Sequence, residues 1–182
     1  MSEDKYLGYR TLIAGEVHAG KTAYTLDILR GLREKHPSNW AILDLAPEKT
    51  RRVGGKVPLT VGEKEEILYF SPLISPPRMM GRNETEVRRL AQENRQRIDP
   101  LLSQIKKRAL PFLLVNDITL YFQDGKAEHF LSFIEGIPTV IMNGYYGRYF
   151  GDSPFSRAER TEMESLMCAC DRVIFLPPVS LG

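Results

Sequence analysis

A stretch near the start of the chain combines the residue types and the spacing that bind a triphosphate. Its members follow the pattern G-x-x-x-x-G-K-[ST] and are Gly15, Glu16, Val17, His18, Ala19, Gly20, Lys21 and Thr22. The glycines let the backbone wrap closely around phosphate oxygens, at which the N–H groups point. We expect the whole stretch to bind phosphates, with Lys21 spanning the β- and γ-phosphates in a catalytic role and Thr22 offering its hydroxyl to Mg²⁺.

The residues on either side of this loop predict the elements that such a site requires. The run from Tyr9 to Ala14 predicts a short buried strand, and the residues after the loop through Lys35 predict a helix. A helix N-terminus behind the loop favours negative charge, which distinguishes the site from a chance match in a surface turn. The side chains of Glu16 and His18 are expected to point outward, without a catalytic role, while their backbone binds.

A carboxylate near the metal is expected where a second strand ends. The apolar run from Phe112 finishes in Asn116 and Asp117, and alternation along a strand lets only one of the two face the loop. We expect Asp117 to be the metal-binding and catalytic acid in either case, since an amide cannot take a proton. Asp44, at the end of an earlier strand, is the next candidate; it either serves the metal or an acceptor, or caps a turn.

Apolar runs separated by helical segments predict a three-layer α/β/α domain with a mainly parallel, five-stranded core sheet. Besides the strand before the loop, the core strands are expected at 40–45, 112–117, 137–142 and 172–176. Helices are expected from Asn83, which would form a capping box with Glu86, and at 127–134 and 156–170. Pro100 is expected to kink or break the first of these, with Asp99 as a second cap.

The segment 46–83 differs from the rest, because prolines, glycines and basic residues crowd it and only 67–70 resembles a strand. It leaves the sheet at the carboxyl edge, where ligands of such folds bind. Its arginines, among them Arg51, Arg52, Arg78 and Arg82, are available for an anionic acceptor or a partner. The alternative is a solvated loop whose charges serve only solubility.

Length and composition bound the remaining possibilities. The 182 residues suit a single domain, 1–182, with the loop-rich insertion at about 46–83. A net charge of +2 forces no conclusion about nucleic acid or membranes, and no nucleic-acid partner is evident. Without a long apolar run or a leader, we expect a cytoplasmic protein with no membrane association. Cys168 and Cys170 cannot complete a zinc site alone and are expected to pack in the core.

The loop and its flanks resemble the P-loop nucleoside triphosphatase superfamily, whose Walker A motif GEVHAGKT matches. Within it, the runs 115–121, 142–147 and 169–175 resemble the cobinamide kinases of corrinoid salvage. Aligned on Thr119, that family's strand-end aspartate falls on Asn116. The bifunctional members of that family carry a guanylyl group on a histidine in the segment after the second strand. His18, His36 and His129 all lie outside that segment, so guanylyl transfer is not expected. The superfamily also implies that Pro177, after the last strand, borders the nucleotide base.

These residues together predict an ATP-binding protein that uses Mg-ATP for hydrolysis or for phosphoryl transfer to a small acceptor. ATP is preferred over GTP because the base-reading motif N-K-x-D is absent. The alternative is a nucleotide-controlled module with slow ATPase activity that acts on a partner protein. An acceptor pocket built by 46–83 would favour the enzyme, whereas a segment that orders only against another protein would favour the module.

Overall fold

The computed structural model describes residues 3–37, 39–48 and 55–178, which form an α/β fold around one all-parallel sheet. The strand order is β3-β2-β4-β5-β1-β6. The strands are β1 (Arg10–Gly15), β2 (Trp40–Asp44), β3 (Leu68–Phe70), β4 (Phe112–Asn116), β5 (Thr139–Tyr145) and β6 (Arg172–Leu176). All five predicted core strands are present, but the predicted count is wrong. The short run in 46–83 joins the same sheet because β3 pairs with β2.

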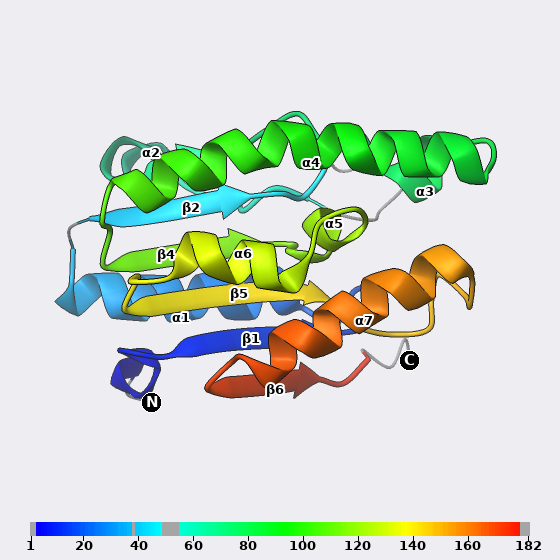
Figure 1. Cartoon of the computed structure of the whole chain (residues 1–182). Coiled ribbons are helices and arrows are strands. Elements are labelled where there is room, and N and C mark those ends of the chain that lie inside the picture. Colours follow the sequence, from blue (N-terminus) through cyan, green and yellow to red (C-terminus); the bar gives the residue numbers. More distant parts are fainter. Residues whose placement is uncertain (1–2, 38, 49–54, 179–182) are drawn as a thin grey trace.

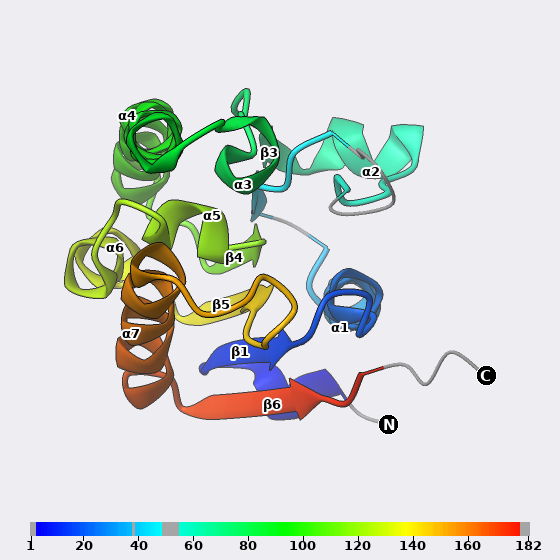
Figure 2. The same cartoon turned by 90° about the vertical axis from the view of Figure 1, so that its right-hand side faces the viewer.

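Helices cover both faces of the sheet (Figures 1 and 2). On one face lies α1 (Lys21–Lys35), with the short η1 (Glu3–Tyr6) packed beside it. The other face carries α4 (Glu84–Lys107), α6 (Ala127–Ile134) and α7 (Pro154–Cys168). The short helices are α2 (Val61–Glu66), α3 (Pro77–Met80) and α5 (Thr119–Phe122). Two apolar cores, one on each side of the sheet, fill the space between these layers.

The expected break at Pro100 does not occur, because α4 continues through it. Ile98 and Leu102 flank the proline and are both fully buried, so packing on each side offsets the one backbone hydrogen bond that proline removes. Asp99 does not act as a cap; its carboxylate pairs with Arg95 and accepts a hydrogen bond from the Tyr121 hydroxyl. The helix begins as predicted, with the Asn83 side chain accepting from the Glu86 N–H.

The described part of the segment 46–83 is folded against the rest of the domain. It contains α2, β3 and α3, and Asn94 of α4 bonds the backbone of Ser75 in both directions, at 3.0 and 2.8 Å. A capping box at Thr60 starts α2. The residues Lys49, Arg51 and Arg52, expected to be available to a ligand, lie outside the described residues.

Candidate functional site

The loop 15–22, for which the sequence predicts phosphate binding, connects β1 to α1. Gly15 is packed so closely that a Cβ atom there would lie 2.7 Å from the Leu176 carbonyl oxygen on β6. Gly20 has φ 78° and immediately precedes α1, so a side chain would be strained at this position. His18 also has a positive φ of 62°, which marks a tight turn in the loop.

Lys21 begins α1 and turns back over the loop. Its Nζ donates to the carbonyl oxygen of Glu16 at 2.6 Å. Burial lowers the pKa of Lys21 below its ordinary value, while the charges of Asp117 and Glu16 act in the opposite direction. The ammonium group is therefore held at the mouth of the loop, where a phosphate oxygen could replace the carbonyl as its partner.

Asn116 connects the loop to two other strands. Its Oδ1 accepts from the Thr22 hydroxyl at 3.1 Å and from Asn143 Nδ2 at 2.9 Å. Its Nδ2 donates to Asp44 Oδ1 at 2.8 Å. Asp44 and Asn116, which end their strands, and Asn143 of β5 are all buried, so this polar network fixes the position of the Thr22 side chain.

Asp117 also lines the site, although alternation along β4 predicts that only one of the two neighbours would. The strand ends at Asn116, and Asp117 adopts a left-handed conformation with φ 58°, which redirects its side chain. Its N–H donates to Asn143 Oδ1 at 3.0 Å. Burial raises the pKa of Asp117 to about 6, against the opposing effect of the Lys21 charge. The prediction that only one of Asn116 and Asp117 would face the loop was therefore wrong, since the turn after β4 lets both line the cavity.

Asp44 adopts the turn-capping alternative. Its Oδ2 accepts from the Val57 N–H at 2.7 Å and from the Tyr69 hydroxyl at 2.6 Å, and its Oδ1 accepts from the Ala46 N–H at 3.3 Å. The side chain is fully buried. Through its hydrogen bonds to Ala46, Val57 and Tyr69, Asp44 holds the start and the middle of segment 46–83 against the sheet.

Glu16 has a structural function that the sequence analysis missed. Its carboxylate does not point outward but accepts from the backbone N–H groups of Arg148 and Tyr149, at 2.8 and 3.2 Å. Although burial alone would raise it, these donors bring the pKa of Glu16 below its usual value. The contact fixes the β5–α7 loop against the phosphate-binding loop. The only sign of this function in the sequence was the presence of a carboxylate, that of Glu16, inside the loop.

A cavity of about 330 Å³ opens beside the loop. Predicted site residues that line it are Val17, His18, Ala19, Gly20, Lys21, Thr22 and Asp117. Gly15 and Glu16 support the loop from behind and are not among its lining residues, and neither is Pro177, whose side chain is exposed after β6. The proposed contact of Pro177 with a nucleotide base remains a prediction. Across from the loop, the cavity is bounded by α3, α5 and Phe150.

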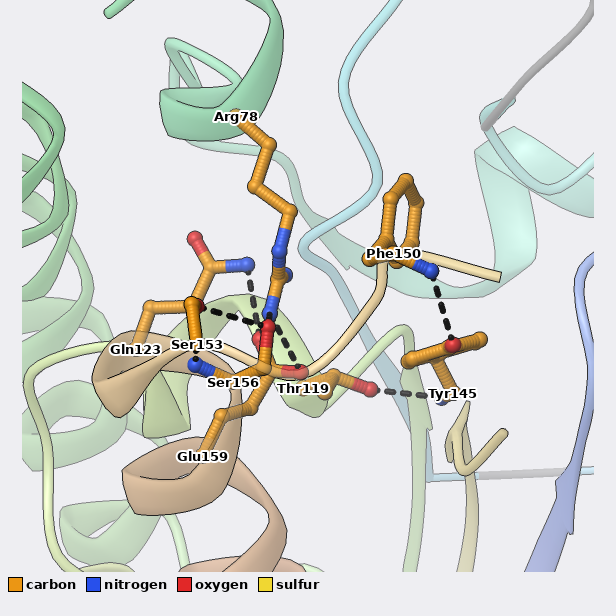
Figure 3. Close-up of polar contacts among 8 residues, drawn as sticks. All are labelled: Arg78, Thr119, Gln123, Tyr145, Phe150, Ser153, Ser156 and Glu159. Atoms are coloured by element: carbon orange, nitrogen blue, oxygen red, sulfur yellow. Dashed lines mark hydrogen bonds and ion pairs between the residues drawn. The ribbon is translucent and has the colours of Figure 1, made fainter. Parts of the chain in front are cut away.

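Arg78 of α3 reaches across to α7 (Figure 3). Its Nη1 and Nη2 donate to the two carboxylate oxygens of Glu159 at 2.7 and 3.0 Å. The guanidinium also lies over the Phe150 and Phe155 rings, at 4.8 and 5.0 Å from their centres. Glu159, only 3% exposed, accepts a further bond from Gln123 Nε2 at 2.9 Å. Sequence reasoning missed this buried pair, whose partners are far apart in the chain.

Four further arginines near this end of the sheet are not among the lining residues of the cavity: Arg82, Arg148, Arg157 and Arg160. Within the described ranges, no cluster of three or more histidine, cysteine or acidic side chains could hold a metal by itself. A Mg²⁺ site shared with phosphates needs only one or two carboxylates. The hydroxyl of Thr22 and the carboxylate of Asp117 supply oxygen ligands of that kind. None of the described helices combines the length and apolar character that a bilayer crossing requires.

Comparison with known proteins supports the fold. No protein-family model matches the chain, and no curated protein matches it in sequence. Among solved structures, the chain is similar to the flagellar accessory protein FlaH from Methanocaldococcus jannaschii, with a TM-score of 0.56. The match covers 94% of this chain and 75% of the FlaH chain at 11% identity. The likeness at this identity shows a shared α/β fold alone.

Proposed function

We propose that this protein binds Mg-ATP at the loop Gly15–Thr22 and transfers the γ-phosphoryl group to a hydroxyl of a small acceptor. The observation that carries the proposal is that residues of the predicted nucleotide site and residues of segment 46–83 line one and the same cavity. Lys21, Thr22 and Asp117 line it from the nucleotide side, and α3 lines it from the opposite side. Hydrolysis is the same reaction with water in place of the acceptor.

In the proposed reaction, the acceptor oxygen forms a bond to the γ-phosphorus while the bond to the bridging oxygen breaks and ADP leaves. Lys21 stabilises the charge on the β- and γ-phosphate oxygens. The proton of the acceptor hydroxyl passes to Asp117, the one carboxylate among the described residues that line the cavity. Thr22 would hold Mg²⁺ through its hydroxyl and Asp117 would hold it through a water molecule, which leaves the carboxylate able to accept the proton. When bound, the ion would neutralise phosphate charge.

The folding of segment 46–83 favours an enzyme over a nucleotide-controlled module. A module whose segment orders only against another protein would leave this segment without internal partners. Instead, Tyr69 bonds Asp44, Ser75 bonds Asn94 and Arg78 bonds Glu159. The segment therefore completes a cavity wall without a partner chain.

Calorimetric titration with Mg-ATP tests the proposal. Lys21→Ala should weaken binding or reduce turnover by ~10-fold or more, equivalent to ~1.4 kcal/mol, because it removes the cation from the β- and γ-phosphates. Lys35→Ala is the matched control: it lies at the other end of α1, paired with Asp4 at 2.6 Å, and should leave binding unchanged. Equal affinity and turnover in the Lys21 variant and the parent would refute the nucleotide site.

A further inference from the structure

The cavity extends beyond the phosphate-binding loop into a compartment with largely apolar walls. Pro76, Pro77 and Met79 line it at α3, Leu120 lines it at α5, and Phe150 lines it after β5. We call this region the acceptor compartment. The whole cavity, including the space beside the loop, is about 330 Å³ and so lies near the small end of the range for ligand sites. An acceptor must therefore have a compact body.

The cationic side chains around this compartment already have partners. Lys21 and Arg78 are the lysine and arginine that line the cavity within the described parts of the chain. Lys21 belongs to the phosphate-binding loop. Arg78 makes a two-fold contact with the buried carboxylate of Glu159 (Figure 3). Its guanidinium also lies over the Phe150 and Phe155 rings. Its charge is thus compensated by a carboxylate that does not itself line the cavity.

Recruiting Arg78 to an anionic ligand would leave Glu159 without its cation. That carboxylate is 3% exposed and would keep only the amide of Gln123 and protein surroundings of low polarity. Leaving one member of a buried pair uncompensated is strongly unfavourable. A second anion would also have to shed its water against proline, methionine, leucine and phenylalanine side chains, and among the described lining residues the neutral Thr119, Gln123 and Tyr145 offer it no compensating charge.

We infer that the acceptor compartment takes an uncharged molecule with a compact apolar or aromatic body that presents a hydroxyl toward Asp117. Arg78 then shapes the wall as a partner of Glu159 and does not bind the ligand. This inference rests on the proposed function and replaces the expectation that Arg78 and Arg82 bind an anionic acceptor. Arg82 is exposed outside the cavity, where its backbone N–H donates to Glu86 at 2.8 Å.

Two neighbouring methionines on α3 provide the test. Met79 lines the cavity and Met80 does not, although both side chains reach the surface, at 36% and 54% exposure. Each is replaced by glutamate and by lysine, and thermal melting verifies that the four variants fold. Ligand-detected NMR then measures binding of benzyl alcohol and benzyl phosphate. The loop is kept occupied by Mg²⁺ and a non-hydrolysable ATP analogue, so that benzyl phosphate cannot bind there.

For an uncharged acceptor, benzyl alcohol should bind more tightly than benzyl phosphate. Both Met79→Glu and Met79→Lys should weaken its binding by ~10-fold, since either charge in an apolar wall must be desolvated. Met80→Glu and Met80→Lys should have no effect.

Tighter binding of benzyl phosphate, strengthened by Met79→Lys and weakened by Met79→Glu, would overturn the inference, as would failure of both probes to bind. The affinity for the ATP analogue is measured separately on the same samples. Its absence would refute the nucleotide site itself, whereas the ranking of the two probes concerns only the class of acceptor.

Discussion

Replacing Asn116 with aspartate tests why an amide stands where the cobinamide kinases, which the sequence resembles, have an aspartate at the end of the strand. In the structure, Asn116 Nδ2 donates to Asp44 Oδ1 at 2.8 Å, and both side chains are fully buried. Asn116→Asp would put a second carboxylate oxygen in place of that donor. The variant must then either accept the repulsion or hold a proton between the two groups.

The loss of stability equals the smaller of the two free-energy costs, that of the repulsion or that of holding the proton. Repulsion at about 3 Å costs ~5 kcal/mol with an effective dielectric constant of ~20. Keeping a proton at pH 7 on an acid with an ordinary aspartate pKa of ~4 costs ~4 kcal/mol, because each pH unit is worth ~1.4 kcal/mol. At pH 5 the second route costs only ~1.5 kcal/mol. Asn116→Asp should therefore lower the free energy of unfolding by ~4 kcal/mol at pH 7 and much less at pH 5.

Urea unfolding at both pH values measures this difference, and the exchange variant provides the control. In Asp44→Asn combined with Asn116→Asp, the new amide at 44 can donate to the carboxylate at 116. Its oxygen can still accept from Val57 and Tyr69, which both bond the same oxygen of Asp44. Most of the stability should return. A loss below ~1 kcal/mol at pH 7, or an equal loss at both pH values, would refute the reasoning.

Three further predictions concern the acid, the buried ion pair and the cysteines. Asp117→Asn should reduce turnover by ~10² or more at unchanged nucleotide affinity. Parent turnover should fall as the pH drops through the Asp117 pKa of about 6, since the protonated carboxyl cannot accept a proton. Arg78→Met should lower the free energy of unfolding by ~3 kcal/mol, because Glu159 loses its buried partner. At pH 8, iodoacetamide should modify the exposed Cys168 well before Cys170, because burial raises the Cys170 pKa to about 12.

A specific result would contradict each of these three predictions. Turnover of the Asp117 variant within two-fold of the parent would remove its proposed role. Arg157→Met is the control for the ion pair, since Arg157 and Asp152 are 58% and 78% exposed and should contribute less than ~1 kcal/mol. An equal loss in the two arginine variants would contradict the buried-pair argument. Mass spectrometry of the alkylated chain measures the two cysteine rates, and equal rates would contradict the predicted difference between Cys168 and Cys170.

The cysteines also show where local reasoning reaches its limit. The sequence predicted that both would pack in the core, yet Cys168 is exposed while Cys170, just past the end of α7, packs against the core. The sequence specified a helix here, but not where α7 ends or how it is rotated on the sheet. Those depend on packing against α5 and α6, which lie elsewhere in the chain.

The local sequence was sufficient to predict the loop 15–22 and the strand and helix that flank it. The spacing of Gly15, Gly20, Lys21 and Thr22, together with continuous apolar runs, predicted the strand–loop–helix unit and the parallel sheet, because each signal is read over a few neighbouring residues. Of the kink or break expected at Pro100, the break does not occur, since burial of both flanking turns outweighs local propensity.

The partners of the polar groups were decided by the tertiary structure alone. Asn116 stands against Asp44 because β2 and β4 are adjacent in register, and Arg78 meets Glu159 because the fold brings side chains of α3 and α7 within hydrogen-bond distance. These pairs are separated by 72 and 81 residues in the chain. Spacing in the sequence carries no sign of such contacts, whereas the energy of a buried charge depends almost entirely on which group the fold brings beside it.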